Sequence, residues 1–331
     1  MTLTNANRFP ELACPVDDAA LQQADAGALL ACPAGHRYPV RGGIARLLVS
    51  QRGYADAFGE QWREYPKTQL DSYTGTTISR DRLRRCLGEA LWLRLGEQAP
   101  MQVLEAGCGA GRFTEVLLER PGAVVTSTDL SAAVEPNQLN FPQSPRHRVV
   151  QCDINHFPFH AQQYDVVVCL GVIQHTRDPE RTIADLYRQV RPGGWLVIDH
   201  YTHSLSLYTR FGEHLLRPVL KRASPARGVA VTKRLTRWFF PLHRAARGFF
   251  PLQAVISRFS PLLTYFHTFP QLSDAQQYEW AELDTHDSLT DFYKHARSRD
   301  AIRRTLNALG GQQVWVARGG NGVEARCQKP Q

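Results

Sequence analysis

Short apolar runs alternate with segments of helical periodicity through the middle of the chain. Five of these runs are predicted strands, at residues 103–106, 124–129, 148–153, 164–170 and 195–199. The fourth is almost unbroken in its apolar character, as expected for a strand buried on both faces of a parallel sheet. A helix with apolar positions three and four residues apart follows it and stops at Pro192-Gly-Gly194. This alternation predicts an α/β fold.

The flanking segments have patterns of their own. Residues 54–95 are helical and aromatic, and they predict a helical cap with two apolar stripes: Phe58, Trp62 and Tyr65, then Leu83, Leu87, Leu91 and Leu95. At the other end, residues 313–318 and 323–327 alternate in period two around Gly319-Gly-Asn-Gly322. Such an arrangement predicts a β-hairpin.

A glycine turn follows the first strand directly. Gly107, Gly109 and Gly111 stand at alternate positions after Glu105 and lead into a predicted helix. Glycine allows backbone conformations closed to other residues, and it lets a ligand lie against the chain at the positive end of the helix. The second and third strands end in Asp129 and Asp153, and a strand-end carboxylate can accept both hydroxyls of a ribose.

This order of features resembles the class I S-adenosylmethionine-dependent methyltransferases, of domain type 11 or 12. The features are the motif E-A-G-C-G-A-G at residues 105–111, the two acids, and V-R-P-G-G-W-L-V-I-D at residues 190–199. The glycine spacing differs from the G-x-G-x-x-G of NAD-binding domains. The resemblance covers about residues 101–201. It implies a Rossmann-like, mostly parallel sheet of seven strands with a C-terminal antiparallel hairpin.

The resemblance also implies S-adenosyl-L-methionine as cofactor and assigns roles to its neighbours. Glu105 would orient the loop and the ligand's amino group, Asp129 would hold the ribose, and Asp153 would meet the adenine amino group. The complete set of residues implied to bind the cofactor is Glu105, Gly107, Gly109, Gly111, Asp129, Leu130, Asp153, Ile154, Leu170 and Gly171.

Methyl transfer is an in-line displacement, so the protein mainly aligns two reactants and, where needed, removes a proton. No metal or covalent intermediate is required. A general base is expected at the carboxyl ends of the fourth and fifth strands. The main candidates are His175, His203 and His286; His200, Tyr201, Asp284 and Asp287 are further ones. Many methyltransferases of similar type have a histidine near the place of His175, although this residue could equally cap a helix or pack in the core.

The N-terminal residues 12–48 are predicted to form a small separate unit. Cys14-Pro-Val-Asp17 and Cys32-Pro-Ala-Gly-His36 resemble the knuckles of the zinc-ribbon-like N-terminal domain that some bacterial methyltransferases carry, including a 23S rRNA guanine methyltransferase. Asp17 stands where the second cysteine is usual, and structural zinc sites prefer Cys and His. A degenerate knuckle without metal and a zinc site both remain open, and we assign no metal here.

Residues 204–269 form a basic insert. It has eleven Lys and Arg against the single acid Glu213, a charge of +10, where the whole chain carries +8. On a helix, one face is apolar and the opposite face holds Arg234, Arg237, Arg244 and Arg247; the apolar positions are Leu235, Trp238, Phe239, Leu242, Ala246 and Phe249. Three interpretations remain: core packing, contact with a membrane or lipid substrate, and nucleic-acid binding, which the separation of aromatic and basic faces disfavours.

These patterns divide the chain into residues 1–50, 51–100, 101–203, 204–272 and 273–331. We expect a cytoplasmic protein, because its seven cysteines are scattered and the sequence shows neither a signal peptide pattern nor a long apolar run. If the insert contacts lipid, the protein would be peripheral to the inner membrane. The arrangement resembles bacterial methyltransferases of glycan or secondary-metabolite assembly. We therefore expect methylation of a small-molecule or lipid- or glycan-linked acceptor. An rRNA or tRNA methyltransferase is the alternative, and a non-catalytic platform protein is disfavoured by the intact glycine loop and acids.

Overall fold

The computed structural model describes residues 9–49 and 56–331. Two expectations concern residues outside this described part. One is the absence of a signal peptide, which concerns the first residues, and the other is the start of the helical cap at Tyr54.

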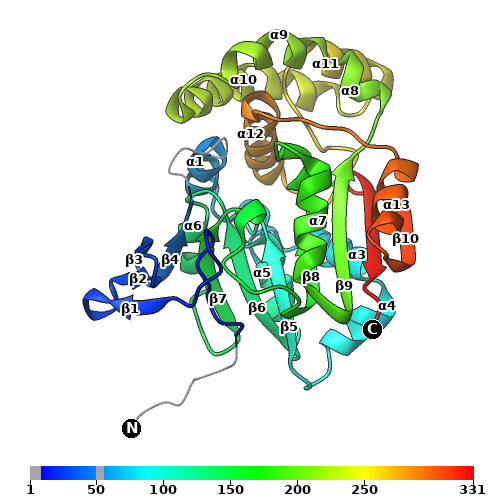
Figure 1. Cartoon of the computed structure of the whole chain (residues 1–331). Helices are drawn as coiled ribbons and strands as arrows, with labels where there is room; N and C mark the ends of the chain where they lie inside the picture. Colours follow the sequence, from blue (N-terminus) through cyan, green and yellow to red (C-terminus); the bar gives the residue numbers. More distant parts are fainter. Residues whose placement is uncertain (1–8, 50–55) are drawn as a thin grey trace.

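One sheet runs through the described part of the chain, in the order β1-β2-β3-β4-β7-β6-β5-β8-β9-β11-β10 (Figure 1). Its strands are β1 Gln22–Ala24, β2 Leu29–Ala31, β3 Arg37–Arg41, β4 Ile44–Leu47, β5 Met101–Ala106, β6 Ala123–Asp129, β7 His147–Cys152, β8 Tyr164–Cys169, β9 Val190–Tyr201, β10 Gln312–Gly319 and β11 Gly322–Gln328. Neighbours from β4 to β9 are parallel, and β11 is antiparallel to both β9 and β10. The expected fold class and the terminal hairpin are confirmed.

The N-terminal unit was expected to be separate, but its strands belong to this sheet. β4 pairs in parallel with β7, where Leu47 lies opposite Cys152, so β1 to β4 extend the seven expected strands. Ile44, Ala45 and Leu47 of β4 are buried. Their apolar side chains join the core while their backbone pairs with β7, which would otherwise be an exposed edge.

Helices cover both faces of the central strands. One face packs against the cap helices α3 Ile78–Leu87 and α4 Glu89–Leu95 and against α5 Arg112–Leu118. The other packs against α7 Pro179–Gln189 and α13 Arg299–Ala308. Neighbouring strand residues divide between the two cores: Val103 and Val166 face the first, and Leu104 and Val167 the second. A parallel strand buried on both faces is therefore apolar at most of its positions.

Two expected boundaries shift. The leucine stripe of the cap is buried, but α3 and α4 are separate helices because Gly88 between them has φ +76°. α7 ends at Gln189, and β9 begins at once and runs through Pro192-Gly-Gly194. The remaining short elements are α1 Asp56–Glu64, α2 Asp71–Thr74, α6 Val134–Asn140, η1 Asp25–Gly27, η2 Ile154–His156 and η3 Ile173–His175.

The insert forms a helical layer above the ends of β8 and β9 (Figure 1). It comprises α8 Leu205–Thr209, α9 Phe211–Leu220, α10 Pro225–Ala246 and α11 Phe250–Phe259, and it packs on α12 Asp274–Thr290. α12 includes Asp284, His286 and Asp287, three of the residues considered as bases. It is buried nearly all round, so its sequence has no apolar stripe to reveal a helix.

The apolar face expected on α10 packs only in part, because Phe239 and Ala246 pack while other members of that face are exposed. Trp238 is 67% exposed and Leu242 is 50% exposed, whereas Thr232, Thr236 and Phe240 are buried. Small threonine side chains let α10 lie close to α12, and Phe240 contacts Ala281 of that helix. Among the described helices, none is both long enough and apolar enough to cross a membrane.

Candidate active site

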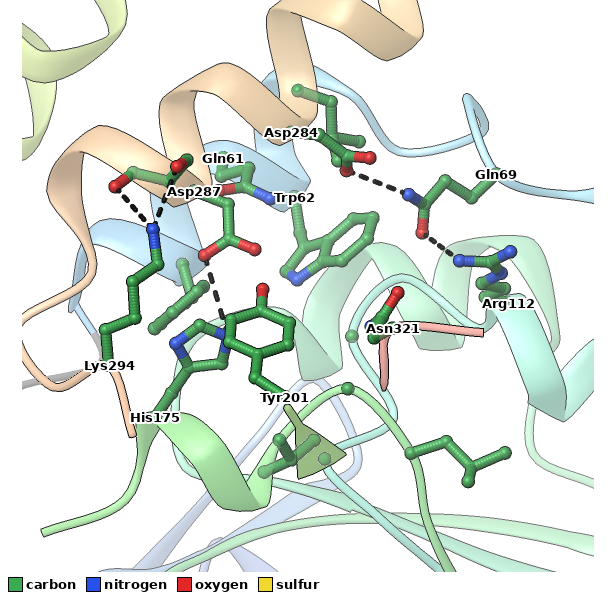
Figure 2. A pocket seen from close by; sticks show the side chains of 18 of the residues that line it. Gln61, Trp62, Gln69, Arg112, His175, Tyr201, Asp284, Asp287, Lys294 and Asn321 are labelled. Carbon is green, nitrogen blue, oxygen red and sulfur yellow. Dashed lines mark hydrogen bonds and ion pairs between the residues drawn. The ribbon is translucent and has the colours of Figure 1, made fainter. Parts of the chain in front are cut away.

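A cavity of about 380 Å³ opens at the carboxyl ends of β5, β8 and β9 (Figure 2). Its lining comes from the cap, the strand ends, the insert, α12 with the segment that follows it, and the turn of the terminal hairpin. Its volume lies within the range of small-molecule pockets, about 300–1,000 Å³, and the position is where open parallel sheets bind ligands.

The glycine turn forms one wall of the cavity. Gly107 and Gly109 line it at φ +78° and +52°. A Cβ on Gly107 would lie 2.2 Å from Val172, and one on Gly109 would lie 2.9 Å from Trp62. The turn therefore needs glycine both for its backbone conformation and for the space beside it. Gly111, at φ +106°, packs against Phe141 and does not line the cavity.

Both strand-end acids line the cavity. Asp129 Oδ2 accepts a hydrogen bond from Gly109 N at 3.0 Å, and its Oδ1 accepts from Ser131 N at 2.8 Å. The carboxylate and the glycine turn are thus held together, and burial raises the pKa of Asp129. Asp153 Oδ1 accepts from Asn155 N at 2.9 Å. The other expected cofactor residues in the lining are Leu130, Ile154, Leu170 and Gly171.

Glu105 lies beneath the glycine turn and does not line the cavity. Its Oε2 accepts hydrogen bonds from Thr114 of α5 at 2.5 Å and from Ser127 of β6 at 2.9 Å. Burial raises the pKa of Glu105 to about 7. The carboxyl group ties β5 to its two neighbours, which supports the predicted role in orienting the loop; contact with a ligand's amino group stays a prediction.

Of the three main base candidates, His175 alone lines the cavity. His203 is exposed and lies 2.5 Å from the hydroxyl of Tyr208. His286 is buried beside Gln61 at 3.0 Å, and burial lowers the pKa of His286 to about 4. His200 is likewise buried, and burial lowers its pKa to about 4. These environments favour neutral, structural imidazoles at the last two positions.

His175 lies between two carboxylates. Its Nδ1 is 3.3 Å from Asp291 Oδ2 and 3.2 Å from the carbonyl oxygen of Tyr293. Its Nε2 is 3.9 Å from Asp287 Oδ1 and has no hydrogen-bond partner among the described residues (Figure 2). Burial works to lower the pKa of His175, but Asp287 and Asp291 outweigh it, and the pKa is raised.

Two more clusters of polar residues lie in the cavity wall. Arg112 donates to Gln69 Oε1 at 3.2 Å, and Gln69 donates in turn to Asp284 Oδ1 at 3.1 Å (Figure 2). Lys294 donates to Ser288 Oγ at 2.9 Å and pairs with Glu213 at 2.5 Å. Burial lowers the pKa of Arg112 to about 10, and in the described residues this guanidinium has no ion-pair partner within 4.0 Å.

Sequence reasoning missed Arg112, Asp291 and Lys294. Arg112 could have been found, because it follows the glycine turn immediately and opens α5. The other two follow α12 without any motif, and they reach the cavity only through the packing of that helix.

Comparisons with known proteins agree with this geometry. Residues 104–198 match the family model of a methyltransferase domain. A ubiquinone biosynthesis O-methyltransferase of Coxiella burnetii is 31% identical over 108 residues, which are 32% of this chain and 46% of that protein. A malonyl-[acyl-carrier protein] O-methyltransferase of Pseudescherichia vulneris is 33% identical over 147 residues, 44% of this chain and 53% of that protein.

The chain spans about half the length of these curated relatives. Among solved structures, magnesium protoporphyrin IX methyltransferase from Synechocystis aligns with a TM-score of 0.38 at 14% identity, over 75% of this chain and 92% of that one. The family match coincides with β5 to β9, the glycine turn and the strand-end acids. Residues 104–198 therefore form a domain that matches the methyltransferase family model, on a Rossmann-like sheet.

Proposed function

We propose that this protein transfers a methyl group from S-adenosyl-L-methionine to a small-molecule or lipid-linked acceptor. The observation that carries the proposal is a single cavity in which the glycine turn, Asp129 and His175 all take part. Cofactor residues and a potential base thus face one space, which is what aligning two reactants requires.

One half of the cavity is lined by the glycine turn, Asp129 and Asp153, and this cofactor half fits S-adenosylmethionine. Gly107 and Gly109 leave a wall free of side chains, Asp129 presents a carboxylate suited to the ribose, and Asp153 lies beside Ile154 for the adenine. Arg112 would meet a carboxylate, either that of the methionine portion or that of an acidic acceptor. The bound cofactor supplies an electrophilic methyl group on a positively charged sulfur.

His175 would act as the general base. With Nδ1 directed toward Asp291 and Tyr293, the ring keeps Nε2 available to take a proton from an acceptor hydroxyl. The rings of Phe58 and Tyr201 contact the imidazole edge-on, with centroids 5.3 Å away in each case, and restrict its rotation. Both relatives described above are named as O-methyltransferases, which supports an oxygen acceptor.

Exposed apolar stripes on the insert favour a lipid-linked acceptor. Phe211, Leu215 and Val219 lie one turn apart on α9 and are all exposed. Leu252, Val255 and Phe259 form a similar exposed stripe on α11, and the two stripes meet where the rings of Phe211 and Phe259 lie 5.8 Å apart. An apolar surface of this kind is typical of helices that lie in a membrane interface.

Positive charge accompanies these stripes. Exposed Arg222, Arg227, Arg234 and Arg237 have no ion-pair partner within 4.0 Å in the part of the chain that the structure describes. Each basic residue near an anionic membrane contributes about 1 kcal/mol of attraction. The same insert reaches the cavity through Leu207, Arg210 and Glu213, so an acceptor held in lipid would lie close to His175.

The test sets vesicle co-sedimentation beside an RNA-binding titration, each at two salt concentrations. We expect binding to phosphatidylglycerol-containing vesicles and weaker binding to phosphatidylcholine alone. If the insert served RNA instead, RNA affinity would fall with log salt at a slope of about −0.7 per phosphate neutralised. Salt-sensitive RNA binding without vesicle binding would contradict the lipid proposal, and binding to neither would leave a water-soluble acceptor.

A further inference from the structure

Two cysteine knuckles in the N-terminal unit bring four potential metal ligands together. Cys14 and Asp17 belong to the first knuckle, in which Asp18 N donates to the carbonyl of Cys14 at 2.9 Å. Cys32 and His36 belong to the second, in which Gly35 N donates to the carbonyl of Cys32 at 3.0 Å. One ligand atom from each of the four side chains lies within 4.8 Å of all the others.

Four of the six distances among these atoms are close to the edges of a tetrahedron around one ion. His36 Nδ1 lies 3.5 Å from Cys14 Sγ, 3.3 Å from Cys32 Sγ and 3.2 Å from Asp17 Oδ2. Cys32 Sγ lies 3.3 Å from Asp17 Oδ2. Zinc bonds of about 2.3 Å to sulfur and about 2.0–2.2 Å to nitrogen or oxygen give tetrahedral edges of about 3.3–3.8 Å.

Hydrogen bonding alone does not account for this convergence. An imidazole nitrogen has either one proton to donate or one lone pair to accept, yet His36 Nδ1 has three polar neighbours within 3.5 Å. A shared cation satisfies all three neighbours at once. The charge of Asp17 also favours a bound cation, because among the described residues its carboxylate has no Lys or Arg ion-pair partner and pairs only with the imidazole of His36.

The other candidate group differs in this respect. His175, Asp287 and Asp291 also lie close together, but Arg217 pairs with Asp291 at 2.7 Å and Lys294 lies 3.7 Å from the same carboxylate. Protein cations therefore already compensate its negative charge.

We propose that Cys14, Asp17, Cys32 and His36 bind one Zn²⁺ ion as a closed structural site. Two soft thiolates with an imidazole and a carboxylate suit zinc, and four protein ligands leave no coordination position for a substrate. The hydroxyl of Tyr38, 3.2 Å from Cys14 Sγ, supplies the hydrogen bond to a ligand that metal sites commonly have.

Such an ion would stabilise the N-terminal unit. β1, β2 and β3 are short, and a unit of about forty residues rarely folds on its own core without a metal or disulfide. Cys14 and Cys32 are buried at the junction with the main core, which includes Leu47 of β4 and Cys152 of β7. Zinc would fix both knuckles to the edge of the sheet.

The test is elemental analysis of the untagged full-length protein, purified without chelator from zinc-supplemented medium. We expect about one zinc per chain, loss of the metal in Cys32→Ser, and its retention in the matched variant Asp18→Asn, which alters the neighbouring acid outside the cluster. Cobalt in place of zinc should give the tetrahedral visible bands and the thiolate charge-transfer absorption of a Cys-ligated ion.

A variant that gains zinc affinity separates the loss of a ligand from misfolding, because a misfolded protein would not bind zinc more tightly. Asp17→Cys restores a third thiolate and should hold zinc against a competing chelator longer than the wild type, while Asp17→Asn should release it sooner. Zinc well below one equivalent in the wild type, or equal chelator resistance in these two variants, would overturn the proposal and return the cluster to hydrogen bonding alone.

Discussion

The cofactor half and the acceptor half of the cavity are built in different ways. Backbone conformation and strand ends make the cofactor half: glycines at positive φ, and Asp129 held by Gly109 N and Ser131 N. Packed helices make the acceptor half, where α12 and the insert bring Asp287, Asp291 and Lys294 to His175. A local motif can specify the first half, whereas the second depends on contacts between segments far apart in sequence.

Replacing His175 should have the largest effect, since it removes the residue that links the two halves. His175→Ala should lower the methylation rate by about 10² to 10⁴, the range for loss of a proton-transferring group. Its affinity for S-adenosylmethionine should change much less. Single-turnover kinetics beside calorimetry would separate the two quantities. A rate loss below about tenfold, or one accompanied by a lower melting temperature, would return His175 to a structural role.

The second largest effect should come from the exposed face of α10, and it should appear only in vesicle binding. Trp238→Ala with Leu242→Ala should weaken vesicle binding by about 3 kcal/mol, at about 1.5 kcal/mol for each large apolar side chain removed from the bilayer. Phe239 is a poorer choice, because it packs against the cluster around Phe240. Leu139→Ala is the control, since Leu139 is 82% exposed but lies on α6. Equal binding by wild type and double variant would remove the insert from lipid contact.

A third change probes the cofactor half by itself. Asp129→Ala should weaken S-adenosylmethionine binding by about 1.5–3 kcal/mol, the scale for losing hydrogen bonds to a charged group. Vesicle binding should stay unchanged. Glu97→Ala replaces an exposed acid outside the cavity and should alter neither property. Unchanged cofactor affinity in Asp129→Ala would mean that the ribose is held elsewhere.

The smallest effect concerns pH. A base must be neutral, so the rate should fall as pH drops through the raised pKa of His175. Asp287→Asn removes a carboxylate that favours the protonated imidazole, which should lower this pKa and move the acidic limb of the pH–rate profile to lower pH. Glu279→Gln on the same helix is the control, because Glu279 contacts Tyr73 and does not line the cavity. An acidic limb that does not move would separate Asp287 from the base.

The contrast between the halves also explains what could be predicted from the sequence. Eight of the ten expected cofactor residues line the cavity, because each lies at or just after the carboxyl end of a parallel strand, and these ends meet at one edge of the sheet; Glu105 and Gly111 do not line it. Asp291 and Lys294 could not be found, since α12 is buried on nearly all sides and its sequence therefore has no apolar stripe that points to the cavity. For α10, periodicity identified the helix, but Trp238 is exposed, and the buried positions include Thr232 and Thr236, which no apolar pattern marks.

The most direct test of the account is calorimetric titration of the wild-type protein with S-adenosylmethionine and, separately, with NADH. The glycine spacing and the cavity at Gly107, Gly109 and Asp129 predict that one S-adenosylmethionine binds per chain and that NADH does not bind. Absence of S-adenosylmethionine binding by folded protein, or tighter binding of NADH, would contradict the assignment of this cavity.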